Sequence, residues 1–160
     1  TQRDKWFADE GGYNHIQGTK PQTLAYGLND SPAGLAAWIV EKYRTWSDCG
    51  GDVEKSYTKD ELLTIVTIYW VTQTISSSTR MYYENQKAVW TMNRDEKVAA
   101  PAGMAMFPQE ISKPPREWGE RSYDVRRWTE MTSGGHFAAL EAPQLLAEEV
   151  RAFFRGFRNL

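Results

Sequence analysis

The sequence predicts an α/β protein in which a helical first part is followed by alternating strands and helices. Three observations support this fold class. From residue 31 to about residue 83, apolar residues recur at helical spacing. From residue 98 onward, short apolar or alternating runs typical of strands are separated by helical segments. The chain also contains 7 Trp, 8 Tyr and 6 Phe, an aromatic content expected for a large core or an apolar ligand pocket.

The first expected helix covers residues 32–46, PAGLAAWIVEKYRTW. Ser31 can cap its amino end, and Pro32 occupies the first helical position. Its apolar residues recur at helical spacing: Leu35, Trp38, Ile39 and Trp46. This pattern predicts an amphipathic helix.

A second helix is expected over residues 61–74, ELLTIVTIYWVTQT. Thr58 and Glu61 form a capping box at its start. Apolar residues occupy nearly all sides of this segment, so we expect the helix to be buried on most sides. The intervening CGGD stretch, residues 49–52, is predicted to be a loop.

The second part has the order strand, helix, strand, helix. Residues 98–107 are expected to form a short buried strand, residues 116–123 a short helix and residues 124–131 a second strand. A final helix over residues 142–157 has Pro143 near its start. A helical crossover between two strands implies that the strands are parallel neighbours, with both following loops at one carboxyl edge. Open α/β sheets bind their ligands at that edge.

Two strands alone cannot form a stable parallel sheet, because such sheets are covered on both faces. We therefore expect further strands from another polypeptide, either a separate fragment or residues missing from this chain. An Asp, Ser or Cys nucleophile on a strand-to-helix turn is expected in that part. This chain has no G-x-S-x-G motif, and Cys49 lies in the loop of the helical half.

Composition excludes several classes of function. The net charge of −2 and the lack of a concentrated Lys/Arg stripe argue against nucleic acid as a partner, so the arginines at 121, 126 and 127 are interpreted as a solvated face. A single Cys and two distant His residues argue against a disulfide framework and a metal site, and no cofactor is expected. The absence of an 18-residue apolar run argues against a membrane span and favours a soluble, cytoplasmic protein.

Glu110 and His136 follow the two predicted strands, so we expect their side chains to meet at one crevice. Gly134 and Gly135 form a tight turn that directs the imidazole. A carboxylate beside an imidazole fixes its tautomer and stabilises the imidazolium, as a general base requires. The alternatives are a histidine held in an ordinary loop and an acid on a surface loop.

Four stretches of the chain resemble the microsomal-type epoxide hydrolases, which have the α/β-hydrolase fold. They are GGYNHIQGTKPQTLAYGLNDSPAGLAAWIVEKYRTW, SSSTRMYYEN, AMFPQE and SGGHFAALEAPQLLAEEVRAFF. The resemblance implies the carboxyl-terminal part of that fold, with residues 1–90 as a portion of the helical cap and residues 91–160 as the end of the core. The family's amino-terminal part is absent from the chain, including its His-Gly-x-Pro type motif and its Asp nucleophile.

The resemblance also implies an activity: hydrolysis of an epoxide, an ether-bond hydrolysis, to a vicinal diol through a covalent ester on the absent Asp. In that mechanism His136 activates water and Glu110 orients the imidazole. Tyr13 and Tyr82 resemble the two cap tyrosines that hydrogen-bond the epoxide oxygen. Tyr83 adjoins Tyr82 but points about 100° away from it on a helix. Without the resemblance, these tyrosines are interpreted as core or rim residues.

Three aromatic residues are candidates for the walls of the substrate pocket: Trp38, Trp70 and Phe137. For the two tryptophans, core packing is the alternative that the sequence favours. His15 lies two residues after Tyr13 and is interpreted as a packing or hydrogen-bonding residue rather than a second base.

The expected partners are an amino-terminal complementary fragment that carries the nucleophile, and a small lipophilic epoxide. A membrane anchor in the missing part and a homo-oligomer of the assembled enzyme stay open. Two other functions also stay open, because a fold is shared across chemistries. One is another α/β-hydrolase, such as a dehalogenase or an esterase, and the other is a non-catalytic binding protein built on half a hydrolase.

Overall fold

The computed structural model describes residues 2–87, 93 and 96–158. Backbone contacts divide the chain into two compact units. The first unit comprises residues 1–40 and 60–90, and the second comprises residues 41–59 and 91–160. The segment 41–59, which lies within the range predicted for the cap, thus clusters with the second unit. Assignment of residues 1–90 to a cap and 91–160 to a core stays a prediction.

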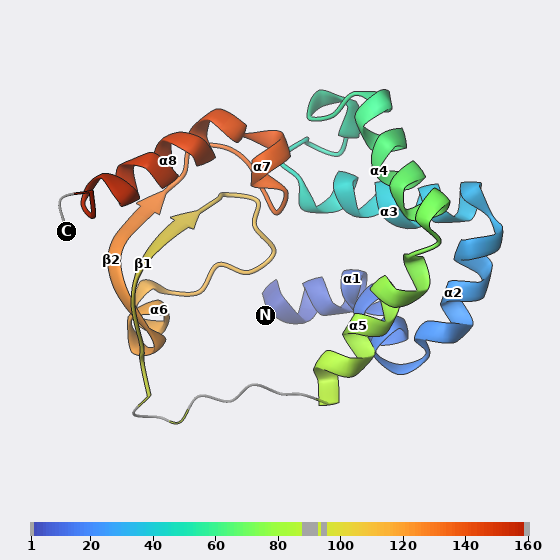
Figure 1. Ribbon diagram of the computed structural model, residues 1–160, viewed down its shortest axis with the longest axis horizontal. Helices are drawn as coiled ribbons and strands as arrows, with labels where there is room; N and C mark the ends of the chain where they lie inside the picture. Colours follow the sequence, from blue (N-terminus) through green and yellow to red (C-terminus); the bar gives the residue numbers. More distant parts are fainter. Residues whose placement is uncertain (1, 88–92, 94–95, 159–160) are drawn as a thin grey trace. The chain divides into compact units, whose positions relative to one another are not determined.

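The first unit is helical (Figure 1). Its helices are α1 (Gln2–Thr19), α2 (Pro21–Asp30), α3 (Pro32–Trp46, which continues into the second unit), α4 (Lys59–Thr72) and α5 (Ile75–Lys87). The predicted helix over residues 32–46 is confirmed, and the predicted helix over residues 61–74 corresponds to α4. Helices α1 and α2 were expected only from the resemblance, which places residues 1–90 in a helical cap.

Helix α3 begins as its sequence requires. The backbone N–H of Gly34 donates to the Ser31 hydroxyl at 3.0 Å, and Pro32 is the first helical residue. Ser31 therefore caps α3, and Pro32 costs no hydrogen bond at this position. One turn further on, the Leu35 side chain is fully buried.

The core of the first unit is formed by four buried side chains: Leu28, Leu35, Val66 and Ile75. Helix α5 packs against both α1 and α2. A Cβ atom at Gly18 in α1 would meet the amide at the end of the flexible Gln86 side chain of α5.

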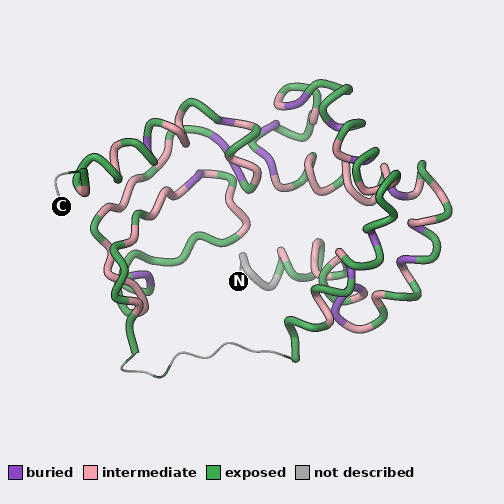
Figure 2. Tube along the Cα trace, viewed as in Figure 1, coloured by how far each residue is buried: buried purple, intermediate pink, exposed green. Residues whose placement is uncertain are grey.

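The expected burial of α4 on most sides is wrong for this chain. Leu62 and Val66 are buried, but Leu63, Ile68 and Val71 are 58%, 56% and 68% exposed. Figure 2 colours most of this helix as exposed. The described residues cover α4 on one face only, the face that carries the buried leucine and valine. A helix that is apolar all round needs cover on its other sides as well.

The second unit contains the predicted order of strands and helices. Its elements are the 3₁₀ turn η1 (Val53–Lys55), β1 (Val98–Met106), α6 (Arg116–Ser122), β2 (Tyr123–Glu130), α7 (Ala138–Glu141) and α8 (Pro143–Arg155). Strands β1 and β2 pair in parallel, from Val98 opposite Tyr123 to Met106 opposite Glu130. The parallel pair predicted from the crossover is therefore confirmed.

Strand β1 is not the buried strand that its composition predicted. None of its nine residues is buried. Helix α8 contacts β1, and a Cβ atom at Gly103 would lie 2.8 Å from the Phe153 ring of that helix. Within the described residues the sheet has two strands, which is too few to enclose either of them.

The loops that follow β1 and β2 lie side by side (Figure 1). Gln109 pairs with Gly135 in an isolated parallel bridge, and the Gln109 N–H donates to the Gly134 carbonyl at 3.1 Å. This bridge extends the parallel pairing beyond the strands, so both loops leave the same edge.

Among the described residues, no helix is both long enough and apolar enough to span a membrane.

Candidate active site

The turn that carries His136 is anchored to the segment after α3. The His136 N–H donates to the Trp46 carbonyl at 2.9 Å, and the Gly134 N–H donates to Asp48 Oδ2 at 3.0 Å. Gly134 has φ of +106°, and a Cβ atom at Gly135 would lie 2.6 Å from the Trp46 carbonyl oxygen. Both glycines are therefore needed for this path of the chain.

Two acids support the turn and were not identified from the sequence. Glu141 accepts hydrogen bonds from the Asp48 N–H at 2.7 Å and from the Phe137 N–H at 2.9 Å. Asp48 accepts its hydrogen bond from the Gly134 N–H of the turn. Asp48 and Glu141 are distant in sequence and belong to no local motif, so no pattern along the chain connects them.

His136 and Glu110 are in direct contact. The distance between His136 Nδ1 and Glu110 Oε1 is 2.7 Å, and the Ile111 N–H donates to the same carboxylate oxygen at 2.7 Å. The two side chains are 40% and 30% exposed. A carboxylate at Nδ1 favours the tautomer that carries its proton there, so Nε2 keeps a lone pair and can accept a proton.

Aromatic rings surround the imidazole. The Trp46 ring meets that of His136 edge to face, with centres 5.4 Å apart. Phe137 stacks on Tyr43, with ring centres 4.0 Å apart and an interplanar angle of 11°. The structure thus places Phe137 in an aromatic cluster beside His136, and its role as a pocket wall stays a prediction.

Tyr13 and Tyr82 are in contact within the first unit. Their ring centres are 5.7 Å apart and the rings are nearly perpendicular, at 87°. On another side Tyr13 stacks on Trp38, with centres 4.9 Å apart and an angle of 23°. Three helices, α1, α3 and α5, each contribute one of these rings.

The Tyr13 phenol is held in its protonated form. Burial raises its pKa well above the ordinary value of 10, and the neighbouring Tyr82 raises it further. A hydrogen bond with Gln17 acts in the opposite direction but is a smaller effect. Because the neutral phenol is the hydrogen-bond donor, Tyr13 can donate throughout the neutral and mildly alkaline range.

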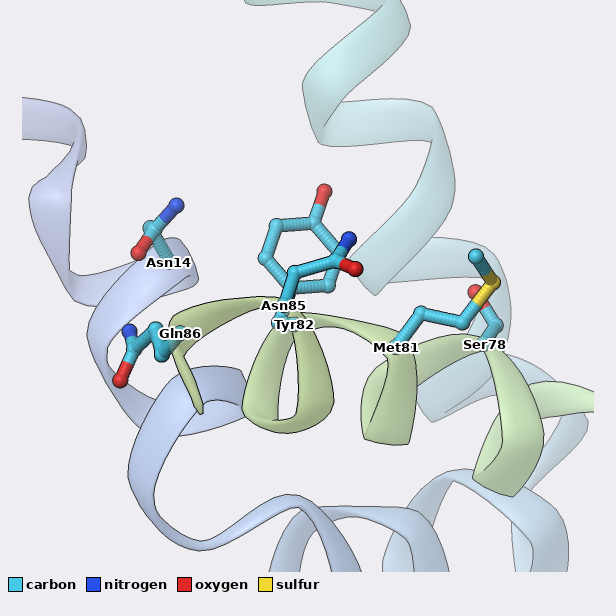
Figure 3. A pocket seen from close by; sticks show the side chains of 6 residues that line it. All are labelled: Asn14, Ser78, Met81, Tyr82, Asn85 and Gln86. Carbon is cyan, nitrogen blue, oxygen red and sulfur yellow. The ribbon is translucent and has the colours of Figure 1, made fainter. Parts of the chain in front are cut away.

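Tyr82 also faces a groove of about 530 Å³ between α1 and α5 (Figure 3). The residues that line it are Asn14, Ser78, Met81, Tyr82, Asn85 and Gln86. Figure 3 shows Asn14 on α1 and the other five side chains along α5. Three carboxamides and a hydroxyl next to a phenol give this groove both donors and acceptors.

The adjacent tyrosine has different surroundings. Tyr83 lines another groove, of about 790 Å³, between α2 and α5. The Lys87 ammonium lies 3.9 Å from the centre of the Tyr83 ring. The structure thus places Tyr82 against Tyr13 and directs Tyr83 elsewhere, as expected for consecutive residues of a helix.

Two other candidates have packing or surface positions. Trp70 packs against the core of the first unit, together with Trp38. His15 is exposed, and its backbone carbonyl accepts a hydrogen bond from the Thr19 hydroxyl at 2.6 Å. Within the part of the chain that the structure describes, no group of three or more His, Cys, Asp or Glu side chains is arranged to hold a metal ion.

Comparison with known proteins identifies epoxide hydrolases as relatives of the chain. The chain is 45% identical to epoxide hydrolase 1 of Sus scrofa over 153 residues, which cover 90% of the chain and 34% of the relative. It superposes on the crystal structure of juvenile hormone epoxide hydrolase from Bombyx mori with a TM-score of 0.85 and 34% identity, covering 96% of the chain and 41% of that structure. For the epoxide hydrolase of Aspergillus niger, the TM-score is 0.80, the identity 29% and the coverage 96% and 38%.

No family model matches the chain. The chain spans about a third of the length of the curated relatives that it matches. The sequence identity and the structural similarity nevertheless extend over almost all of its own residues. The curated homologues of the chain are therefore epoxide hydrolases, and the chain has the carboxyl-terminal portion of their α/β-hydrolase fold.

Proposed function

We propose that the chain is the portion of an epoxide hydrolase that supplies the epoxide-activating phenols and the water-activating base. The observation that carries this proposal is the contact between Tyr13 and Tyr82, whose ring centres are 5.7 Å apart. An epoxide is a poor electrophile until its oxygen accepts hydrogen bonds, and two adjacent phenols are suited to donate them. A histidine–acid pair alone would fit many hydrolases.

The first chemical step opens the ring. A carboxylate of an Asp nucleophile, which this chain does not contain, attacks one epoxide carbon. The carbon–oxygen bond breaks, its electron pair goes to oxygen, and the oxygen takes a proton from Tyr13 or Tyr82. The raised pKa of Tyr13 supports its role as a neutral donor at the start of this step.

The second step hydrolyses the ester. His136 Nε2 takes a proton from water, whose oxygen attacks the ester carbonyl, while Glu110 stabilises the imidazolium. The acyl–oxygen bond then breaks, and the leaving diol oxygen takes the proton from His136. The second proton of the water returns to the phenolate as the nucleophilic carboxylate reforms. The 2.7 Å contact between His136 and Glu110 supports these roles.

This mechanism requires an amino-terminal complement. We propose that it supplies the nucleophile and further strands of the sheet, and that the enzyme is active only with it. The exposure of β1 and of the apolar residues of α4 supports a partner of this kind. The substrate class that we propose is a small lipophilic epoxide, in keeping with the aromatic content of the chain.

Tyr13→Phe and Tyr82→Phe test the proposal in the enzyme that contains this chain. Each variant is expected to lower kcat/KM for an epoxide by about 10²–10⁴-fold, because the proton donor is lost. Hydrolysis of an activated ester, which needs no phenol, is expected to change little. Tyr83→Phe is the matched control, since its ring lies in a different groove.

Two results would contradict the proposal. Unaffected epoxide turnover in both phenylalanine variants would favour another α/β-hydrolase, such as an esterase or a dehalogenase. A complement without an acidic nucleophile at its strand-to-helix turn would favour a non-catalytic binding protein.

A further inference from the structure

The indole of Trp38 lies against one face of the Tyr13 ring. The two rings stack with centres 4.9 Å apart and an interplanar angle of 23°, whereas Tyr82 meets Tyr13 edge to face. Trp38 comes from α3, Tyr13 from α1 and Tyr82 from α5. The Tyr13 ring is therefore held between side chains of two other helices.

Trp38 is itself fixed in place. Its side chain packs against the core of the first unit, which includes the fully buried Leu35 of the same helix. Helix α3 is capped by Ser31 one turn before Leu35. A ring held by a core in this way can restrict the orientation of a neighbour that it stacks on.

The ring face of Trp38 is its main contribution to this contact. Its indole nitrogen is buried and has no hydrogen-bond partner among the described residues. A role based on the N–H would require an acceptor, and a role based on the ring requires only the stack. A phenylalanine at this position would keep a stacking ring and would remove the buried donor.

We infer that Trp38 is a positioning residue that holds the Tyr13 phenol against Tyr82 and keeps water away from it. The inference deepens the proposed function, since it concerns the phenol that would activate the epoxide. Trp38 acts by orienting Tyr13 and does not itself contact the substrate.

The electrostatics of Tyr13 agree with this role. Burial is the largest cause of its raised pKa, and the titratable groups that act on it are Tyr82 on α5 and Tyr69 on α4. Trp38, on α3, carries no titratable group, so it acts by excluding water. Its removal would admit water to the Tyr13 phenol and lower the pKa toward the ordinary value of 10.

The test follows the Tyr13 phenol directly, by carbon NMR of the complete enzyme that contains this chain, labelled with ¹³C at tyrosine Cζ. The Tyr13 signal is assigned by its loss in Tyr13→Phe. In the unmodified enzyme we expect the chemical shift of this signal to stay at its neutral-phenol value at about pH 10, where an ordinary tyrosine titrates. In Trp38→Leu we expect the chemical shift of the Tyr13 signal to change as the pH is raised to about 10. In Trp38→Phe we expect the chemical shift to stay as in the unmodified enzyme.

Trp70→Leu is the matched control, because Trp70 is another tryptophan that packs against the core of the first unit. It is expected to leave the Tyr13 titration unchanged. If far-UV circular dichroism shows that Trp38→Leu does not fold, Trp38→Met takes its place. An unchanged Tyr13 titration in the folded variant would overturn the inference, as would an equal change in Trp70→Leu.

Kinetics then separate this inference from the proposed function. In the active enzyme, Trp38→Leu is expected to lower kcat for epoxide opening about tenfold or more, with little change in KM and a new decline at alkaline pH. Trp38→Phe is expected to keep the kcat and the alkaline activity of the unmodified enzyme. A shifted Tyr13 titration together with turnover that is insensitive to Tyr13→Phe would overturn the proposed function but not the positioning of the phenol.

Discussion

At the scale of single residues, several ionisable side chains lie where a neighbouring group orients them or where burial or a hydrogen bond shifts their pKa. Glu110 contacts Nδ1 of His136, and burial keeps Tyr13 neutral. The same principle applies away from the candidate site. Glu149 of α8 is nearly buried, and its carboxylate accepts hydrogen bonds from both the Arg127 guanidinium and the Thr129 hydroxyl of β2. These contacts join the last helix to the sheet.

We predict that Glu149→Gln lowers the melting temperature at neutral pH by about 2–4 °C. The hydrogen bonds from Arg127 hold the pKa of the Glu149 carboxyl below its ordinary value of 4.5. A depressed carboxyl pKa stabilises the folded state above pH 4.5, and this stabilisation is lost as the pH falls through the folded-state pKa. The difference between the two proteins, measured by circular dichroism, should therefore shrink in acid.

The exposed neighbour Glu148→Gln is the control for this measurement, since it should shift the melting temperature little at any pH. A Glu149→Gln deficit that stayed constant from pH 7 to about pH 3 would show that the carboxylate charge is not what stabilises this contact.

At the scale of elements, local patterns predicted most of the second unit. Apolar runs on both sides of a helical segment predicted β1, α6 and β2 of that unit. In the first unit, Pro32 after the capping residue Ser31 predicted where α3 begins. Helices α1 and α2 were expected only from the resemblance, which places residues 1–90 in a helical cap, and the helical spacing of Leu24, Ala25 and Leu28 in α2 was missed. The contacts of Asp48 and Glu141 were also missed, since they form only when distant segments meet.

The turn between β2 and α7 is the element on which the position of His136 depends. We predict that Gly135→Ala destabilises the chain by about 1–3 kcal/mol, because the new Cβ would lie 2.6 Å from the Trp46 carbonyl oxygen. The variant should also lose the amide protection of His136, measured by hydrogen exchange, since the His136 N–H donates to that carbonyl.

Gly27→Ala in α2 is the matched control, since a Cβ there would have no neighbour within 4 Å. It should leave the exchange of His136 unchanged and stabilise the helix slightly. Equal stability and equal His136 protection in the two alanine variants would mean that the turn tolerates a side chain and does not fix the imidazole.

At the scale of the whole molecule, the described residues leave one strand and parts of two helices uncovered. Strand β1 has no buried residue, and apolar side chains of α4 and α8 are exposed. The sequence predicted the two parallel strands. That further strands come from another polypeptide stays a prediction, made because two parallel strands are too few to be stable. The sequence could not predict which face of α4 would stay exposed, since an all-round apolar helix gives no preferred side.

We propose that His136 activates the water that hydrolyses a covalent ester formed on another part of the enzyme. The most direct measurement is intact-mass spectrometry of the active enzyme carrying His136→Gln, mixed with an epoxide. We predict that the polypeptide bearing the nucleophile gains the mass of one substrate molecule and keeps it, while the unmodified enzyme returns to its original mass. Unchanged turnover by the variant, or epoxide binding without any such adduct, would contradict the account.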